Sequence, residues 1–138
     1  MKKGKKLTVV IGSSRLGAAI ASQNSKQGIY TSIIDINEEA FRKLDEGYSG
    51  FKIVGDAIEI RTLEKAHIKD ASEVDVCTGD DNTNIFIASL ILKYYDVPYI
   101  IVRLHDDIKR SLLENPRITI ISPSSLSLGL YENLWDGD

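Results

Sequence analysis

The sequence predicts an α/β fold, with a doubly wound parallel sheet of six strands and helices on both faces. Two observations carry this prediction. Strand-like and helix-like patterns alternate six times along the 138 residues, and no repeat or linker divides the chain. Alternation of this kind produces right-handed crossovers between parallel strands. We therefore expect one domain over residues 1–138.

Each expected element has its own local signal. The first strand, "KLTVVIG", is β-branched and apolar, as in a strand covered on both faces. The first helix ends at Gly28, a residue typical of helix ends, and Asn37 is placed to cap a second helix with an acidic first turn. The expected strands lie at 6–12, 29–35, 51–56, within 73–81, at 99–104 and at 118–122, and the expected helices at 15–27, 37–44, 59–66, 82–95 and 106–114.

Composition argues against several classes of protein. The chain is 43% hydrophobic and 27% charged, with a net charge of −3, and no apolar run is long enough to cross a bilayer. The charges are interspersed and form no strongly basic face, so the charge pattern does not favour a nucleic-acid partner. The lysines of residues 1–6 form a basic tail, either solvated or in contact with anionic lipid. With a single cysteine, Cys77, the chain cannot form an intrachain disulfide or a metal site of several cysteines. Because disulfides are typical of secreted proteins, we expect a cytoplasmic protein.

The turn after the first strand, "GSSRLG", is the first candidate site. Gly12 permits a tight turn, Gly17 permits close helix–sheet packing, and backbone N–H groups face a phosphate in such Rossmann-like turns. Ser14 stands where the usual fingerprint has glycine; it is small, and its hydroxyl could donate a hydrogen bond. Arg15 adds a charge-assisted phosphate contact. The alternative interpretation is an ordinary strand-to-helix turn that binds no phosphate. The predicted phosphate loop is Gly12, Ser13, Ser14, Arg15, Leu16 and Gly17.

Polar groups follow the next strands, at the edge where parallel sheets bind ligands. Asp35 comes 18 residues after the glycine turn (35 − 17), where a carboxylate bonds ribose hydroxyls and disfavours a 2′-phosphate. Residues 55–57 form a turn that would border adenine, and residues 78–84 either line the phosphates or only cap the next helix. The predicted binding residues here are Asp35, Ile36, Asn37, Gly55, Asp56, Ala57, Thr78, Gly79, Asp80 and Asn82.

The fifth strand ends at a further candidate, Arg103, which faces the same crevice or pairs with Asp106 or Asp107. Catalytic machinery is not evident, because His67 is expected at a helix end on the surface and His105 has no nucleophile beside it. We therefore predict a binding protein rather than an enzyme, and no metal site.

Taken in order, five segments resemble the nucleotide-binding N-terminal domain of TrkA-type proteins, also called RCK or KTN domains. They are "VVIGSSRLGAAIA", "IIDINEEAFRKL", "GDAIEIRTLEKAHIKDASEVDVCTGDDNTNIFIASL", "VPYIIVRLHDD" and "ITIISPSSL", within roughly residues 6–127. The resemblance implies that Arg15 contacts phosphate, that Asp35 holds ribose, and that residues 55–57 border adenine. It also implies that Thr78 and Gly79 close over the ligand.

Family membership would define the ligand and the partners. The resemblance implies that NAD(H), ATP, ADP or AMP binds as a regulator, and that the protein assembles as a homodimer or larger ring beneath a membrane subunit. We therefore expect a cytoplasmic regulatory subunit at the inner face of the cell membrane that gates an integral-membrane potassium transporter or channel. The alternative is a subunit of an NAD-dependent dehydrogenase, completed by another chain that supplies a substrate domain.

Two departures from the family leave questions open. Relatives usually carry glycine where Ser14 stands, so the phosphate geometry and the choice of nucleotide are not defined by the resemblance. Many relatives also carry a C-terminal ligand-binding domain, which we do not expect in this chain. Residues 123–138 instead contain several apolar side chains in a polar segment. They either contact a second copy of the chain or fold back on their own sheet.

Overall fold

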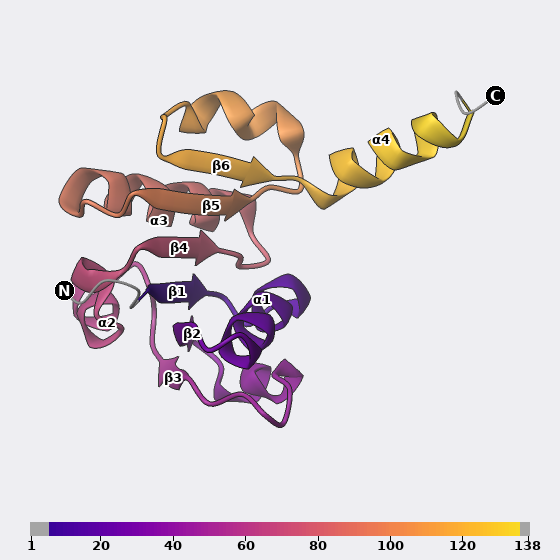
Figure 1. Cartoon of the computed structure of the whole chain (residues 1–138). Coiled ribbons are helices and arrows are strands. Elements are labelled where there is room, and N and C mark those ends of the chain that lie inside the picture. The colour runs from indigo at the N-terminus through magenta and orange to yellow at the C-terminus, as the bar shows by residue number, and fades with distance from the viewer. Residues whose placement is uncertain (1–5, 136–138) are drawn as a thin grey trace.

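The computed structural model describes residues 6–135. They form a six-stranded parallel sheet in the order β3-β2-β1-β4-β5-β6 (Figure 1). The strands are β1 (Leu7–Ile11), β2 (Tyr30–Asp35), β3 (Phe51–Val54), β4 (Glu73–Val76), β5 (Tyr99–Arg103) and β6 (Ile118–Ile121). The predicted Rossmann-like, doubly wound α/β fold is thereby confirmed.

Four α-helices and three 3₁₀ helices (η) lie between or after these strands. They are α1 (Arg15–Lys26), η1 (Glu38–Lys43), α2 (Ile60–Lys65), η2 (Ile68–Asp70), α3 (Asp81–Tyr94), η3 (Asp107–Leu113) and α4 (Pro123–Trp135). The helices expected at 37–44 and 106–114 are thus 3₁₀ helices. Both are short, and both begin at an Asx cap, Asn37 or Asp106, that accepts the N–H two residues later and so favours a tight first turn.

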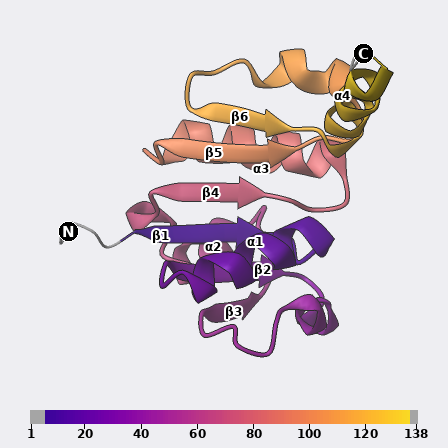
Figure 2. The same ribbon diagram turned by 45° about the vertical axis from the view of Figure 1, so that its right-hand side comes forward.

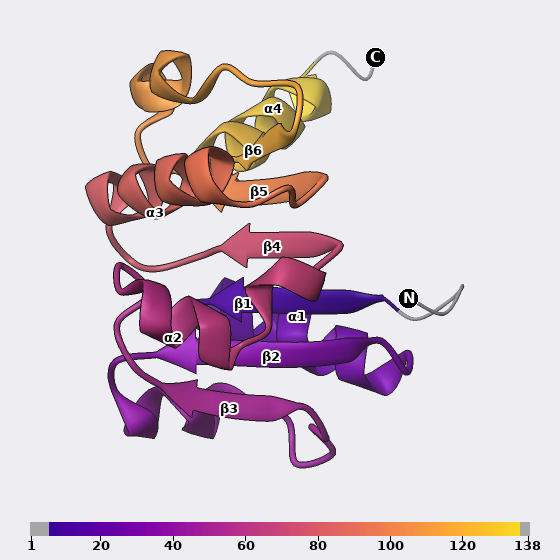
Figure 3. The same ribbon diagram turned by 90° about the vertical axis from the view of Figure 1, so that its left-hand side faces the viewer.

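Two apolar clusters lie on opposite faces of the sheet. On one face α1 covers β1 and β2, where Ala21 packs with Val10 and Ile33 (Figure 2). On the other face α2 and α3 supply Leu63 and Ile87 to the larger cluster (Figure 3). Successive strand residues therefore serve different faces, which is why β1 is apolar without alternation.

The strand order places a crevice at the middle of the sheet. β1 lies between β2 and β4, and the chain leaves β1 toward one face and β4 toward the other. Ligands of open parallel sheets bind outside the carboxyl ends of the strands at such a switch point. The turns after β1 and β4 are therefore the two walls of the expected site.

The C-terminal helix α4 projects away from the sheet (Figure 1). None of its side chains is buried. Its exposed large apolar residues are Leu126, Leu128, Leu130, Tyr131, Leu134 and Trp135. The expectation of a helix folded back on its own sheet is therefore wrong, whereas a contact with a second copy stays a prediction.

Parts of two predicted segments lie outside the described residues. These are residues 1–5 of the basic tail and residues 136–138 after α4. Within the described part of the chain, no helix combines the length and the apolar character that crossing a membrane requires.

Candidate nucleotide-binding site

The glycine turn brings β1, α1 and the end of β4 into backbone contact. Gly12 has a φ of 97°, and a Cβ atom built there would lie 2.7 Å from the Thr78 amide nitrogen. A Cβ atom on Gly17 would overlap the carbonyl oxygen of Gly12. Only glycine fits these two positions, as the sequence pattern predicted.

Ser14 has a structural role in the turn. Its hydroxyl donates to the carbonyl oxygen of Cys77 at 2.7 Å, and the same oxygen accepts the Gly17 N–H at 3.1 Å as the N-cap of α1. The hydroxyl proton is therefore not directed at a phosphate. The N–H groups of Ser14, Arg15 and Leu16 have no partner within residues 6–135, and they form the free donor set of the helix N-terminus.

Asp35 connects the glycine turn to the end of β2. One carboxylate oxygen accepts the Ser13 N–H and the other accepts the Asn37 N–H, each at 2.8 Å. Each oxygen retains acceptor capacity, so the carboxylate is oriented and can still bond two ribose hydroxyls. Lys43 approaches the same corner, where its ammonium group donates to the Ser13 carbonyl at 3.3 Å.

The turns after β3 and β4 lie on either side of the turns after β2 and β1. The Gly55 N–H donates to the Asp35 carbonyl at 3.0 Å, which holds the predicted adenine turn against β2. Asp80 caps α3, because its carboxylate accepts the hydroxyl of Thr83 at 2.7 Å and the N–H of Thr83 at 2.9 Å. These hydrogen bonds, first that of the hydroxyl and then that of the N–H, lower the pKa of Asp80.

These turns surround a cavity of about 440 Å³. Twelve of the predicted residues line it: Gly12, Ser13, Ser14, Asp35, Ile36, Asn37, Gly55, Asp56, Ala57, Thr78, Gly79 and Asp80. The residues of the lining that the sequence analysis did not single out are Ile11, Ile34, Ala40, Lys43, Thr83 and Ile87. The segment 78–84 therefore both lines the cavity and caps α3.

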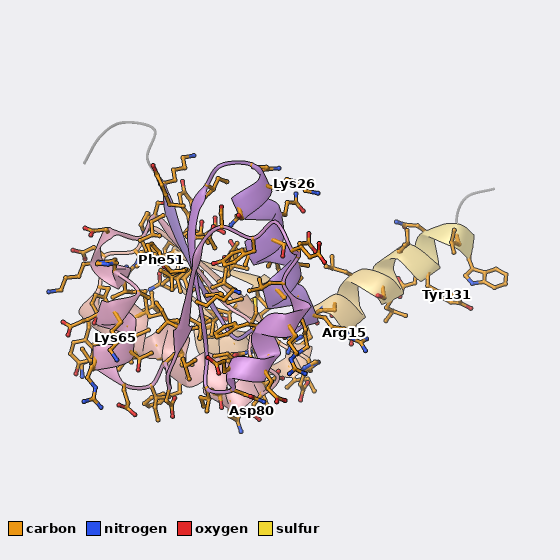
Figure 4. The ribbon with its side chains drawn as sticks, turned by 90° about the horizontal axis from the view of Figure 1, so that it is seen from below. Arg15, Lys26, Phe51, Lys65, Asp80 and Tyr131 are labelled. Carbon is orange, nitrogen blue, oxygen red and sulfur yellow. The ribbon has the colours of Figure 1, made fainter. Side chains whose placement is uncertain are left out.

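The other five predicted residues do not line the cavity. Gly17 and Leu16 lie in the first turn of α1, and Arg15 is exposed on the side from which α4 projects (Figure 4). Asn82 accepts a hydrogen bond from the Lys109 ammonium group at 3.1 Å. Arg103 donates to the carbonyl oxygen of Thr78 at 2.5 Å, so it reaches the cavity wall from outside.

The cysteine and the two histidines do not line the cavity. Cys77 is buried, and burial, together with the nearby Asp75, raises the pKa of its thiol to about 12, so the thiol is not ionised near neutral pH. His67 and His105 are exposed at loop positions. The described residues contain no group of three His, Cys, Asp or Glu side chains that could hold a metal ion.

The six-stranded sheet, its crevice at the β1–β4 switch point and the free N–H groups of α1 define a nucleotide-binding domain of the Rossmann class. Comparison with known proteins then assigns the family. The chain belongs to the TrkA-N domain family, whose model matches residues 8–123.

The matched relatives are potassium uptake proteins. Over 108 residues the chain is 33% identical to a Trk system potassium uptake protein TrkA homolog of Pyrococcus horikoshii, a match that covers 78% of this chain and 47% of the relative. The chain thus spans about half the length of the curated relatives it matches.

Two solved structures share the fold across nearly the whole chain. The GsuK channel bound to NAD is 25% identical with a TM-score of 0.78, over 99% of this chain and 24% of that one. GsuK bound to ADP is 26% identical with a TM-score of 0.75, over 94% and 33% of the two chains.

Proposed function

We propose that this chain is the nucleotide-sensing domain of a potassium uptake system. One observation carries the proposal: the turns after β1, β2, β3 and β4 converge on one cavity, where the Asp35 carboxylate lies beside the glycine turn and accepts the Ser13 N–H. This arrangement fits a phosphate at α1, a ribose diol at Asp35 and an adenine beside residues 55–57. The ligand that we propose is an adenine nucleotide, one of NAD(H), ATP, ADP or AMP.

Regulation, rather than catalysis, is the role we propose for that nucleotide. The relatives are uptake proteins, and two structures of a related channel are described as bound to NAD and to ADP. A dehydrogenase would also need a substrate domain and a proton-transfer group facing the nicotinamide. The nucleotide would act by binding two conformations with different affinity, since a ligand with equal affinity shifts neither.

The proposed partners are an integral-membrane potassium transporter or channel subunit and further copies of this chain. The support for self-association is α4, which exposes six large apolar side chains. A 13-residue helix of this kind is marginal in water on its own and gains most of its stability from packing. We propose that α4 contacts a second copy in a dimer or larger ring at the inner face of the cell membrane.

The proposal is tested by identifying and titrating the ligand. Small molecules released from the purified, gently unfolded protein are identified by mass spectrometry, and NAD, NADH, ATP, ADP and AMP are then titrated by calorimetry. We expect Asp35→Asn to weaken every bound nucleotide by about tenfold or more, because a charged hydrogen bond to the ribose is lost. The exposed, matched variant Glu39→Gln should bind as the wild type does.

Two results would contradict this function. A wild-type protein that is purified empty and binds none of the five nucleotides has no nucleotide to sense. Unchanged affinities in a folded Asp35→Asn variant would instead remove Asp35 from the site, and with it the proposed orientation of the ligand.

A further inference from the structure

Lys43 is the one cation that lines the cavity within the described part of the chain. Its ammonium group donates one hydrogen bond, to the Ser13 carbonyl, and at 3.3 Å this bond is longer than the usual N–H···O range of about 2.7–3.2 Å. Among residues 6–135 no carboxylate lies within 4 Å of the ammonium group. Two of its three N–H donors are therefore free for a ligand. The other charged side chains of the lining are those of Asp35, Asp56 and Asp80.

The fold holds the backbone of Lys43 beside the glycine turn. The buried Ser13 hydroxyl donates to the Ala40 carbonyl at 2.8 Å, which ties η1 to the turn. Lys43 follows Ala40 by three residues, and residues three apart lie on the same side of a 3₁₀ helix. Both residues line the cavity. The lysine therefore reaches the Ser13 corner of the cavity from a defined position.

Asp35 and Lys43 meet at the same residue from two sides. One Asp35 oxygen accepts the Ser13 N–H at 2.8 Å, while Lys43 donates to the Ser13 carbonyl. The carboxylate and the ammonium group still form no ion pair, so they are more than 4 Å apart. Two hydrogen bonds that meet at one oxygen span up to about 5.5 Å, and the flexible lysine stem adjusts to that distance. A hydroxyl group therefore fits between the two charges.

A ribose hydroxyl bound at Asp35 needs a donor as well as an acceptor. The carboxylate accepts the hydroxyl proton but has no proton to donate in return. On this side of Asp35 the N–H and the hydroxyl of Ser13 are both already used. The Lys43 ammonium group has free N–H donors at the same corner, and it completes the hydrogen bonds of the ribose hydroxyl.

We infer that Lys43 donates to the ribose hydroxyl whose proton Asp35 accepts, and that this pair makes the site select ribonucleotides over deoxynucleotides. The inference rests on the proposed nucleotide site and names a residue of that site that recognises the sugar. A deoxyribose leaves the carboxylate and the ammonium group without the hydroxyl between them. The effect of Lys43 on affinity therefore follows the presence of one hydroxyl group and not the charge of the phosphates.

The experiment titrates ADP, 2′-deoxy-ADP and 3′-deoxy-ADP by calorimetry. Lys43→Met removes the ammonium group of an exposed side chain, so the variant should fold, as circular dichroism checks. We expect its ADP affinity to fall on the order of 10-fold, because a charged hydrogen bond is lost. The analogue that lacks the contacted hydroxyl should bind wild type and variant with equal affinity. The other analogue should lose as much affinity as ADP does.

Arg42→Met is the matched control, because it removes one positive charge from the neighbouring residue of η1. Arg42 does not line the cavity, and its ion pair with Glu39 is exposed, so all three affinities should stay unchanged. Equal losses for the three ligands in Lys43→Met would indicate attraction of the phosphate charge instead of a contact with the sugar. That result, or an unchanged ADP affinity, overturns the inference and leaves the nucleotide site intact. A wild-type protein that binds no adenine nucleotide overturns the proposed function as well.

Discussion

Gly17 is a residue at which a single added methyl group should affect the whole site. A Cβ atom there would overlap the Gly12 carbonyl oxygen, and that oxygen belongs to backbone that cannot move without opening the turn. We expect Gly17→Ala to lower the free energy of unfolding by roughly 2 kcal/mol or more, as for an overpacked core. Gly79→Ala is the matched control, because no atom lies within 4 Å of its built Cβ. Urea denaturation measures both, and equal stabilities would contradict this account of the turn.

Residue types predicted the position of the site better than they predicted individual contacts. The place of Asp35 at the cavity could be predicted because its distance from the glycine turn follows from the strand–helix–strand unit. The hydroxyl of Ser14 was expected to face phosphate, but it bonds the Cys77 carbonyl, and that partner is 63 residues away in the sequence. Lys43 was missed for the same reason. Its hydrogen bond to the Ser13 carbonyl joins residues that are far apart in the sequence and meet only because η1 packs beside the glycine turn.

At the scale of elements, one arginine holds the end of α3 against the start of β6. The Arg117 guanidinium donates to the carbonyl oxygens of Leu92, Tyr95 and Val97 at 2.9–3.1 Å, which satisfies acceptors that a helix end leaves free. A lysine cannot reach three divergent carbonyls with one ammonium group. We expect Arg117→Lys to cost roughly 1–3 kcal/mol of unfolding free energy.

The measurement for Arg117 is thermal and urea denaturation beside a control. Arg110→Lys changes an exposed arginine whose bond is to Asp107 in the same 3₁₀ helix, and exposed pairs contribute little. If both lysine variants unfold alike, the Arg117 cap does not stabilise the junction of α3 and β6.

The elements themselves were predicted by periodicity and caps, with ends that differ from the expected ends by at most two residues. The fourth strand, expected within 73–81, ends at Val76, because Thr78 and Asp80 bond α3 instead of a neighbouring strand. The two 3₁₀ helices could not be distinguished from α-helices by pattern, since a six- or seven-residue segment is too short to separate their periods.

At the scale of the whole molecule, the parallel sheet could be predicted from alternation alone, whereas the strand order and the direction of α4 could not. The apolar content of residues 123–138 fitted equally a helix on its own sheet and a helix on another chain. A sheet face and a second protomer offer the same apolar surface to a short segment, so composition carries no information on which of them is used.

The α4 helix gives the decisive test of assembly. Leu126 and Leu130 lie one turn apart on α4, 66% and 65% exposed, and burying each would contribute at least about 1.5 kcal/mol. The double variant Leu126→Gln/Leu130→Gln should therefore weaken a dimer about 100-fold and reduce helicity, since the free helix is marginal. Light scattering and circular dichroism measure the two effects, with Ser127→Gln on the same helix as the control. A wild-type protein that is monomeric with α4 fully helical would mean that no second copy is needed to stabilise α4.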